Sequence, residues 1–163
     1  MHLDKYWDKI EKRADQGDTP YNLRNCAYMD DFNKPKIFYR EISDEMNAAY
    51  AKEPIYINNK AYIITGNHLI YILCYLNSSV FNKVILRFAN STGGKGPEFL
   101  LSQNLFKPSA SQEEYVINLF DRLHDIQELT GKNKIEAQIN DFFFSIYGLT
   151  SEERMFIETS NSQ

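Results

Sequence analysis

Few side chains of this 163-residue chain have the type and spacing that enzymatic chemistry requires. The five prolines are never adjacent, so the Asn/Asp-Pro-Pro-aromatic loop of amino-methyltransferases is absent from the sequence. Gly93-Gly-Lys-Gly96 is too short for a P-loop and has no Ser or Thr after its lysine. The three histidines, His2, His68 and His124, lack the spacing of a zinc site, and no Glu-x-Lys motif of a metal-dependent nuclease is present. We therefore expect no catalytic residue and no metal site in this chain.

Charge is distributed unevenly along the chain, although the net charge is only −4. Residues 19–107 hold ten basic and seven acidic residues, a balance of +3, whereas residues 110–163 hold four basic and ten acidic residues, a balance of −6. A mildly basic centre with an acidic tail is compatible with one face that contacts phosphates and another that faces solvent or protein. Charge alone leaves the choice between these partners open.

Cationic and amide side chains in the basic centre are candidates for polar contacts with a partner. If that partner is duplex DNA, Lys and Arg would bind its phosphates, and Arg, Lys and Asn would read its base edges. The candidates for base reading lie on or beside expected strands and loops, and they are Arg40, Asn58, Asn59, Lys60, Asn90 and Lys95. Glycine lets the backbone approach a phosphate closely because it has no Cβ. The candidates for phosphate contact are Arg24, Lys36, Lys83 and Arg87, with the backbone N–H groups of Gly93, Gly94 and Gly96.

Each candidate has an ordinary structural alternative. Arg24 could pair with Asp30 or Asp31 and order its turn. Lys36 and Arg40 could be charges at a strand edge that discourage aggregation. The pair of asparagines at 58–59 could serve a turn, and the glycines at 93–96 could form a surface loop.

The elements that position these residues are a small sheet and several helices. The patterns predict a helix over residues 3–14, a strand over 36–42, and one bent strand or two short strands over 55–65. Residues 68–89 read as two helices that meet at Asn77-Ser-Ser79. A glycine-rich loop at 90–97 and a short strand at 99–101 follow.

The remainder of the chain is predicted to be helical. Ser111-Gln-Glu-Glu114 reads as a capping box that opens a helix ended by Gly131. A second helix is expected over residues 133–147, and Thr150-Ser-Glu-Glu153 caps a short last helix. The fold class is therefore α+β, a small mixed or antiparallel sheet with packed helices and a C-terminal helical hairpin.

The two cysteines, Cys26 and Cys74, show no pairing or metal-binding pattern, which favours reduced structural thiols. The longest apolar run, residues 69–76, is too short to cross a bilayer, and the N-terminus lacks the apolar core of a secretion signal. We expect a cytoplasmic protein that does not contact a membrane.

Several segments, in their order and spacing over roughly residues 1–158, resemble the TaqI-like C-terminal specificity domain of Type IIG restriction–modification enzymes and related DNA adenine methyltransferases. The matching segments are Tyr21-Asn-Leu-Arg-Asn-Cys-Ala-Tyr28, Lys34-Pro-Lys-Ile-Phe-Tyr-Arg-Glu-Ile-Ser43, Asn58-Asn-Lys-Ala-Tyr-Ile-Ile-Thr-Gly66, Tyr71-Ile-Leu-Cys-Tyr-Leu-Asn-Ser78 with Phe81, Thr92-Gly-Gly-Lys-Gly96, Ile139-Asn140, and Ile146-Tyr-Gly-Leu-Thr-Ser-Glu-Glu153. Two details depart from the family pattern. Residues 105–109 replace a Pro-Ile-Pro-like segment, and Asn140 stands where an aspartate is common.

This resemblance implies a domain that recognises a sequence in double-stranded DNA while other domains act on it. It implies an upstream methyltransferase domain that binds S-adenosylmethionine, often with a nuclease domain that would use Mg²⁺; no cofactor is expected in this chain itself. We accordingly divide the chain into an N-terminal connector helix (1–18), an α/β target-recognition core (19–109), a helical hairpin with a terminal helix (110–158) and a frayed tail (159–163).

Two further functions compete with DNA recognition. The acidic hairpin could dock onto a partner subunit, so that the chain acts as a protein-interaction module without DNA contact. A small stand-alone enzyme is the third possibility, and the missing catalytic motifs argue against it.

Overall fold

The computed structural model describes residues 2–43, 45–84, 90–91, 97–98 and 106–159. At its centre is an antiparallel sheet in the order β2-β1-β3, formed by β1 (Lys36–Arg40), β2 (Ala49–Ala51) and β3 (Ala61–Thr65). Two further short strands, β4 (Asn90–Ser91) and β5 (Pro97–Glu98), pair with each other. The α+β class is confirmed, and the sheet is antiparallel.

Strand β1 lies at the middle of the sheet, where it pairs with β2 on one edge and β3 on the other, and its side chains alternate between the two faces. Ile37 and Tyr39 are buried in the main core, whereas Arg40 at the end of the strand is exposed. Burial raises the pKa of Tyr39 to about 12. The observed strand ends at Arg40, two residues before the end predicted at residue 42.

The rest of the sheet differs from the sequence prediction. Only residues 61–65 of the predicted 55–65 segment are a strand, because residues 58–60 form the turn that leads into it. Strand β2 was not predicted; its three residues, Ala49-Tyr-Ala51, are too few to show an alternating pattern. The strand predicted at 99–101 lies outside the described residues.

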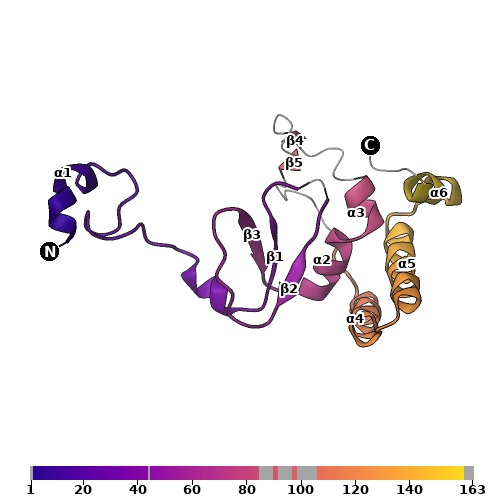
Figure 1. The fold of residues 1–163 in the computed structure, drawn as a ribbon. Helices are drawn as coiled ribbons and strands as arrows, with labels where there is room; N and C mark the ends of the chain where they lie inside the picture. Colours follow the sequence, from indigo (N-terminus) through magenta and orange to yellow (C-terminus); the bar gives the residue numbers. More distant parts are fainter. Residues whose placement is uncertain (1, 44, 85–89, 92–96, 99–105, 160–163) are drawn as a thin grey trace.

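Helices α2 (Leu69–Leu76) and α3 (Ser79–Lys83) meet at the predicted break. Ser78 is the N-cap of α3, and its Oγ accepts a hydrogen bond from the N–H of Phe81 at 3.3 Å. Helix α2 lies between the sheet and the C-terminal helices (Figure 1).

The C-terminal part contains α4 (Ala110–Asp125), α5 (Leu129–Ile146) and α6 (Ser151–Thr159), of which α4 and α5 form the predicted hairpin. The capping box of α4 is formed by Ser109 and Gln112, so the prediction of Ser111 as the cap was wrong by two residues. Gly131 lies inside α5 and does not end α4. A Cβ at Gly131 would lie 2.8 Å from the Cγ2 atom of Ile126, so glycine allows the first turn of α5 to approach the C-cap residue of α4 closely.

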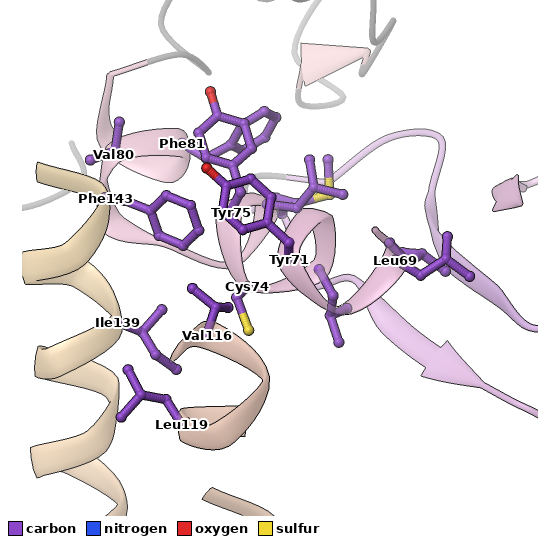
Figure 2. Close-up of a cluster of buried hydrophobic side chains, with 14 of the residues drawn as sticks. Leu69, Tyr71, Cys74, Tyr75, Val80, Phe81, Val116, Leu119, Ile139 and Phe143 are labelled. Atoms are coloured by element: carbon purple, nitrogen blue, oxygen red, sulfur yellow. The ribbon is translucent and has the colours of Figure 1, made fainter. Parts of the chain in front are cut away.

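Aromatic and aliphatic side chains from the helices form one core with the buried face of the sheet. Figure 2 shows Val116 of α4 and Ile139 and Phe143 of α5 directed toward Cys74 and Tyr75 of α2. Burial raises the pKa of the Cys74 thiol to about 12, and an unionised thiol is a poor nucleophile. Cys74 is therefore a core residue, as the sequence indicated, and both cysteines are free.

An N-terminal arm, residues 2–27, extends away from the sheet (Figure 1). It begins with a 3-10 turn, η1 (Leu3–Tyr6), and one turn of helix, α1 (Trp7–Ile10), so the predicted 3–14 helix is shorter than expected. The ring of Trp7 packs on that of Tyr21, with centroids 5.3 Å apart. A second 3-10 turn, η2 (Met29–Asn33), leads into β1. Among the described residues, no helix is long and apolar enough to span a bilayer.

Candidate functional site

Four of the predicted base-reading residues lie together at one end of the sheet. Arg40 ends β1 and is the cross-strand partner of Ala61, the first residue of β3. Lys60 immediately precedes Ala61, and its carbonyl accepts a hydrogen bond from the N–H of Glu41 at 3.0 Å. Asn58 and Asn59 form the turn before Lys60. We call Arg40, Asn58, Asn59 and Lys60 the sheet-end cluster.

Hydrogen bonds of Asn58 hold the turn at residues 58–60 of the cluster in place. The Oδ1 atom of Asn58 accepts a hydrogen bond from the N–H of Lys60 at 3.0 Å, and its carbonyl accepts one from Ala61 at 3.3 Å. This is the local geometry in which asparagine replaces a backbone group in a turn. The side chain of Asn59 is exposed and forms no hydrogen bond within the described residues, so its amide is available to a ligand.

Two cations of the sheet-end cluster are also accessible. Arg40 is exposed and forms no ion pair with any described residue. The Nζ atom of Lys60 lies 3.9 Å from Oε2 of Glu41, and the lysine side chain is 74% exposed. A contact this long at the surface contributes less than about 1 kcal/mol, so it does not commit the lysine to Glu41.

A hollow of about 490 Å³ adjoins the cluster along the outer edge of β3. Asn58 and Asn59 line it together with residues of η2 and β3, namely Tyr28, Asp31, Phe32, Ile57, Ala61, Tyr62, Ile63 and Thr65. The ring of Phe32 packs between those of Tyr28 and Tyr56, with centroid distances of 5.9 and 5.3 Å. Sequence reasoning missed these aromatic neighbours, because only the fold brings residues 28–32 beside residues 56–63.

Three of the predicted phosphate contacts lie elsewhere and have partners. Lys36 is 0% exposed and donates a hydrogen bond to the carbonyl of Glu53 at 3.3 Å. This burial argues against a phosphate contact, because the ammonium group does not reach the surface. Lys83 donates to the carbonyl of Glu158 at 3.1 Å and so ties α3 to the last turn of α6, where cations are favourable.

Arg24 belongs to the N-terminal arm, the segment of residues 2–27 that extends away from the sheet (Figure 1). Its Nη1 atom is 3.3 Å from Oδ1 of Asp15, so the alternative pairing with Asp30 or Asp31 was wrong in its partner. Both side chains are more than 70% exposed, and a weak surface pair of this kind can exchange for another anion.

Of the remaining candidates, Asn90 lies in β4, where its backbone pairs with Glu98 of β5. Arg87, Gly93, Gly94, Lys95 and Gly96 lie outside the described residues.

Within the described ranges, no group of three or more His, Cys, Asp or Glu side chains could hold a metal ion. The sheet-end cluster offers an exposed amide at Asn59 and an exposed guanidinium at Arg40, which can form hydrogen bonds with a ligand.

Comparison with known proteins gives one family. Residues 2–104 match the model of the TaqI-like C-terminal specificity domain, which covers more than half of the chain. No curated protein matches the sequence.

Proposed function

The chain belongs to the family of TaqI-like C-terminal specificity domains, and from this premise we propose that it recognises a short sequence in double-stranded DNA for a Type IIG restriction–modification enzyme. Other domains of that enzyme would bind S-adenosylmethionine and methylate adenine, and a nuclease domain, where present, would use Mg²⁺. The family is one of specificity domains and not of catalytic domains, which agrees with the missing catalytic motifs.

The sheet-end cluster is the observation that supports this proposal. Arg40 can donate two parallel hydrogen bonds to a guanine, and the free amide of Asn59 can bind an adenine through one donor and one acceptor. Both side chains are exposed at one end of β1 and β3, on a sheet whose residues Ile37 and Tyr39 belong to the core shared with the helices. Such a support holds the reading groups in a fixed geometry.

The test is selection from a pool of random duplexes at moderate salt, followed by affinity measurements on the enriched site. Arg40→Ala and Asn59→Ala should each weaken binding to that site by about 5- to 150-fold, since one bidentate base contact contributes about 1–3 kcal/mol of discrimination. Affinity should also fall steeply between about 50 and about 200 mM salt.

Arg122→Ala is the matched control, because Arg122 is an exposed arginine of α4 that lies outside the sheet-end cluster. It removes the same charge and should change affinity much less than Arg40→Ala. If no motif is enriched from the pool, sequence recognition by this chain is rejected. Equal losses for the two arginine variants would reduce the role of Arg40 to bulk charge.

A further inference from the structure

A groove of about 910 Å³ lies on the other side of the sheet from the sheet-end hollow. One wall is the outer edge of β2, the opposite wall is the α4–α5 hairpin, and the junction of α2 and α3 lies between them. The lining residues are Ala48, Ala49, Tyr50, Lys52, Leu73, Cys74, Asn77, Ser78, Ser79, Phe120, Asp121, Leu123, His124, Glu136, Ile139 and Asn140.

The register of the sheet shows that the backbone of β2 is open toward this groove. Because the N–H of Glu41 donates to Lys60 on the β3 side, the odd-numbered residues of β1 bond β3 and the even-numbered ones bond β2. Tyr50 stands opposite Ile37, so its N–H and C=O point away from β1. They form no hydrogen bond with a described residue.

Asn77 shows that this edge already accepts a strand-like partner. Its Nδ2 donates to the carbonyl of Ala48 at 2.9 Å, and its Oδ1 accepts from the N–H of Ala48 at 2.9 Å. A residue of a neighbouring strand would make the same two bonds. Asn77 therefore takes the place of a strand partner at Ala48. The backbone N–H and C=O of Tyr50, the next outward-facing residue, have no such partner among the described residues.

The charges around the groove select the kind of chain that could fill it. Asp121 of α4 and Glu136 of α5 line the helical wall, and neither forms an ion pair with a described residue. Lys52, at the end of the β2 wall, is likewise unpaired within the described part of the chain. His124 of the same helical wall lies with its Nδ1 3.0 Å from the carbonyl of Phe120. An incoming chain with basic side chains toward the helices would neutralise both carboxylates.

We propose that this groove binds an extended, basic polypeptide segment of a partner chain, which adds to the outer edge of β2 as a fourth strand. The backbone of the segment bonds Tyr50, its Lys or Arg side chains face Asp121 and Glu136, and an acidic side chain is favoured near Lys52. Backbone pairing at an open edge supplies affinity, and the charged wall supplies selectivity. The groove shares no lining residue with the sheet-end hollow, so peptide binding can be tested without DNA.

The first test pans the full chain against a displayed library of random ten-residue peptides and then uses synthetic peptides of the enriched sequences. We expect enrichment of Lys and Arg, and we expect bound peptide to slow amide hydrogen exchange of Tyr50 by about tenfold or more, because its N–H becomes bonded. The amide of Ala51, which faces β1, is the internal control. A library without an enriched basic sequence, or unchanged exchange at Tyr50, overturns the proposal.

The second test separates strand addition from general attraction to an acidic surface. Asp121→Asn with Glu136→Gln should weaken peptide binding about five- to thirtyfold at low salt. Glu114→Gln with Glu152→Gln removes the same charge from exposed residues that do not line the groove, and should have little effect. Two peptides test the backbone pairing, one N-methylated at its odd-numbered residues and one at its even-numbered residues. Only alternate residues of an added strand bond β2, so one of the two peptides should lose binding and the other should keep it. Equal effects of the two double variants, or equal binding of the two N-methylated peptides, would contradict the proposal.

Discussion

The two edges of the three-stranded sheet are both bordered by asparagines, but the structure uses them in opposite ways. Beside β3, Asn59 is exposed and its amide has no partner among the described residues. Beside β2, the Oδ1 atom of Asn82 accepts the N–H of Met46 at 2.7 Å, and its Nδ2 lies 3.5 Å from the carbonyl of the same residue. Asn77 makes the equivalent pair of bonds to Ala48.

This difference shows that residue type alone does not assign a role. The amides beside β2 hold the segment that enters β2 against α2 and α3, so they belong to the fold. The amides beside β3 are held on a turn that needs only one of their oxygens, so the other groups remain available for a ligand. Substitution at the β2 edge should therefore affect stability, whereas substitution at the β3 edge should affect binding.

The largest effect is expected for Asn82→Ala. This change removes the acceptor of a half-buried backbone N–H and the donor near three carbonyls, those of Met46, Leu76 and Ser78. An unsatisfied buried polar group costs about 1–3 kcal/mol, so we expect a loss of about 2–3 kcal/mol in the free energy of unfolding, measured with urea. Asn133→Ala on the exposed face of α5 is the control and should cost less than about 0.5 kcal/mol. Equal losses for the two variants would remove the distinction between the edges.

A smaller effect should appear at alkaline pH, through the strand that both edges share. Burial raises the pKa of Tyr39 from 10.0 to about 12, so the folded state keeps the phenol protonated where the unfolded chain loses the proton. Its contribution to stability is complete below pH 10 and is lost as the pH rises from 10 toward 12.

Over this range we expect the free energy of unfolding to fall by about 1–2 kcal/mol. Urea unfolding at several pH values measures this loss. Burial raises the pKa of Tyr75 as well, so Tyr39→Phe should reduce the alkaline decline without abolishing it. If the stability of Tyr39→Phe declined by the same amount at alkaline pH, titratable groups other than Tyr39 would be responsible for the decline.

The sequence was sufficient for the elements whose signals are local. The break between α2 and α3 follows from a serine that caps a helix, and the last helix follows from Thr150 and Glu153, whose side chains bond each other's backbone as predicted. The cap of α4 was misplaced because residues 109–114 contain two overlapping capping patterns, and only the fold selects Ser109.

The candidate site could be predicted only in part. Asn58, Asn59 and Lys60 are adjacent in the chain, so one turn presents them together. Arg40 joins them through the register of β1 and β3, which a single sequence does not show. Alternation places Lys36 on the same face of β1 as Arg40, yet its burial depends on the segment at Glu53, which covers it from a distant part of the chain. The groove beside β2 could not be predicted for the same reason, because its walls come from segments that are distant in the sequence.

The smallest effect on stability distinguishes the two neighbouring asparagines at the β3 edge. Asn58→Ala removes the side-chain oxygen that accepts from Lys60 and should lower the free energy of unfolding by about 0.5–1.5 kcal/mol. Asn59→Ala removes no bond to a described residue and should change it by less than about 0.5 kcal/mol. Urea unfolding of both variants, beside their affinity for a selected duplex, separates a turn residue from a reading residue. Because Asn59 should affect DNA affinity without affecting the fold, a stability loss as large as that of Asn58→Ala would place it in the turn, and the amide that we assign to base recognition would then be a structural one.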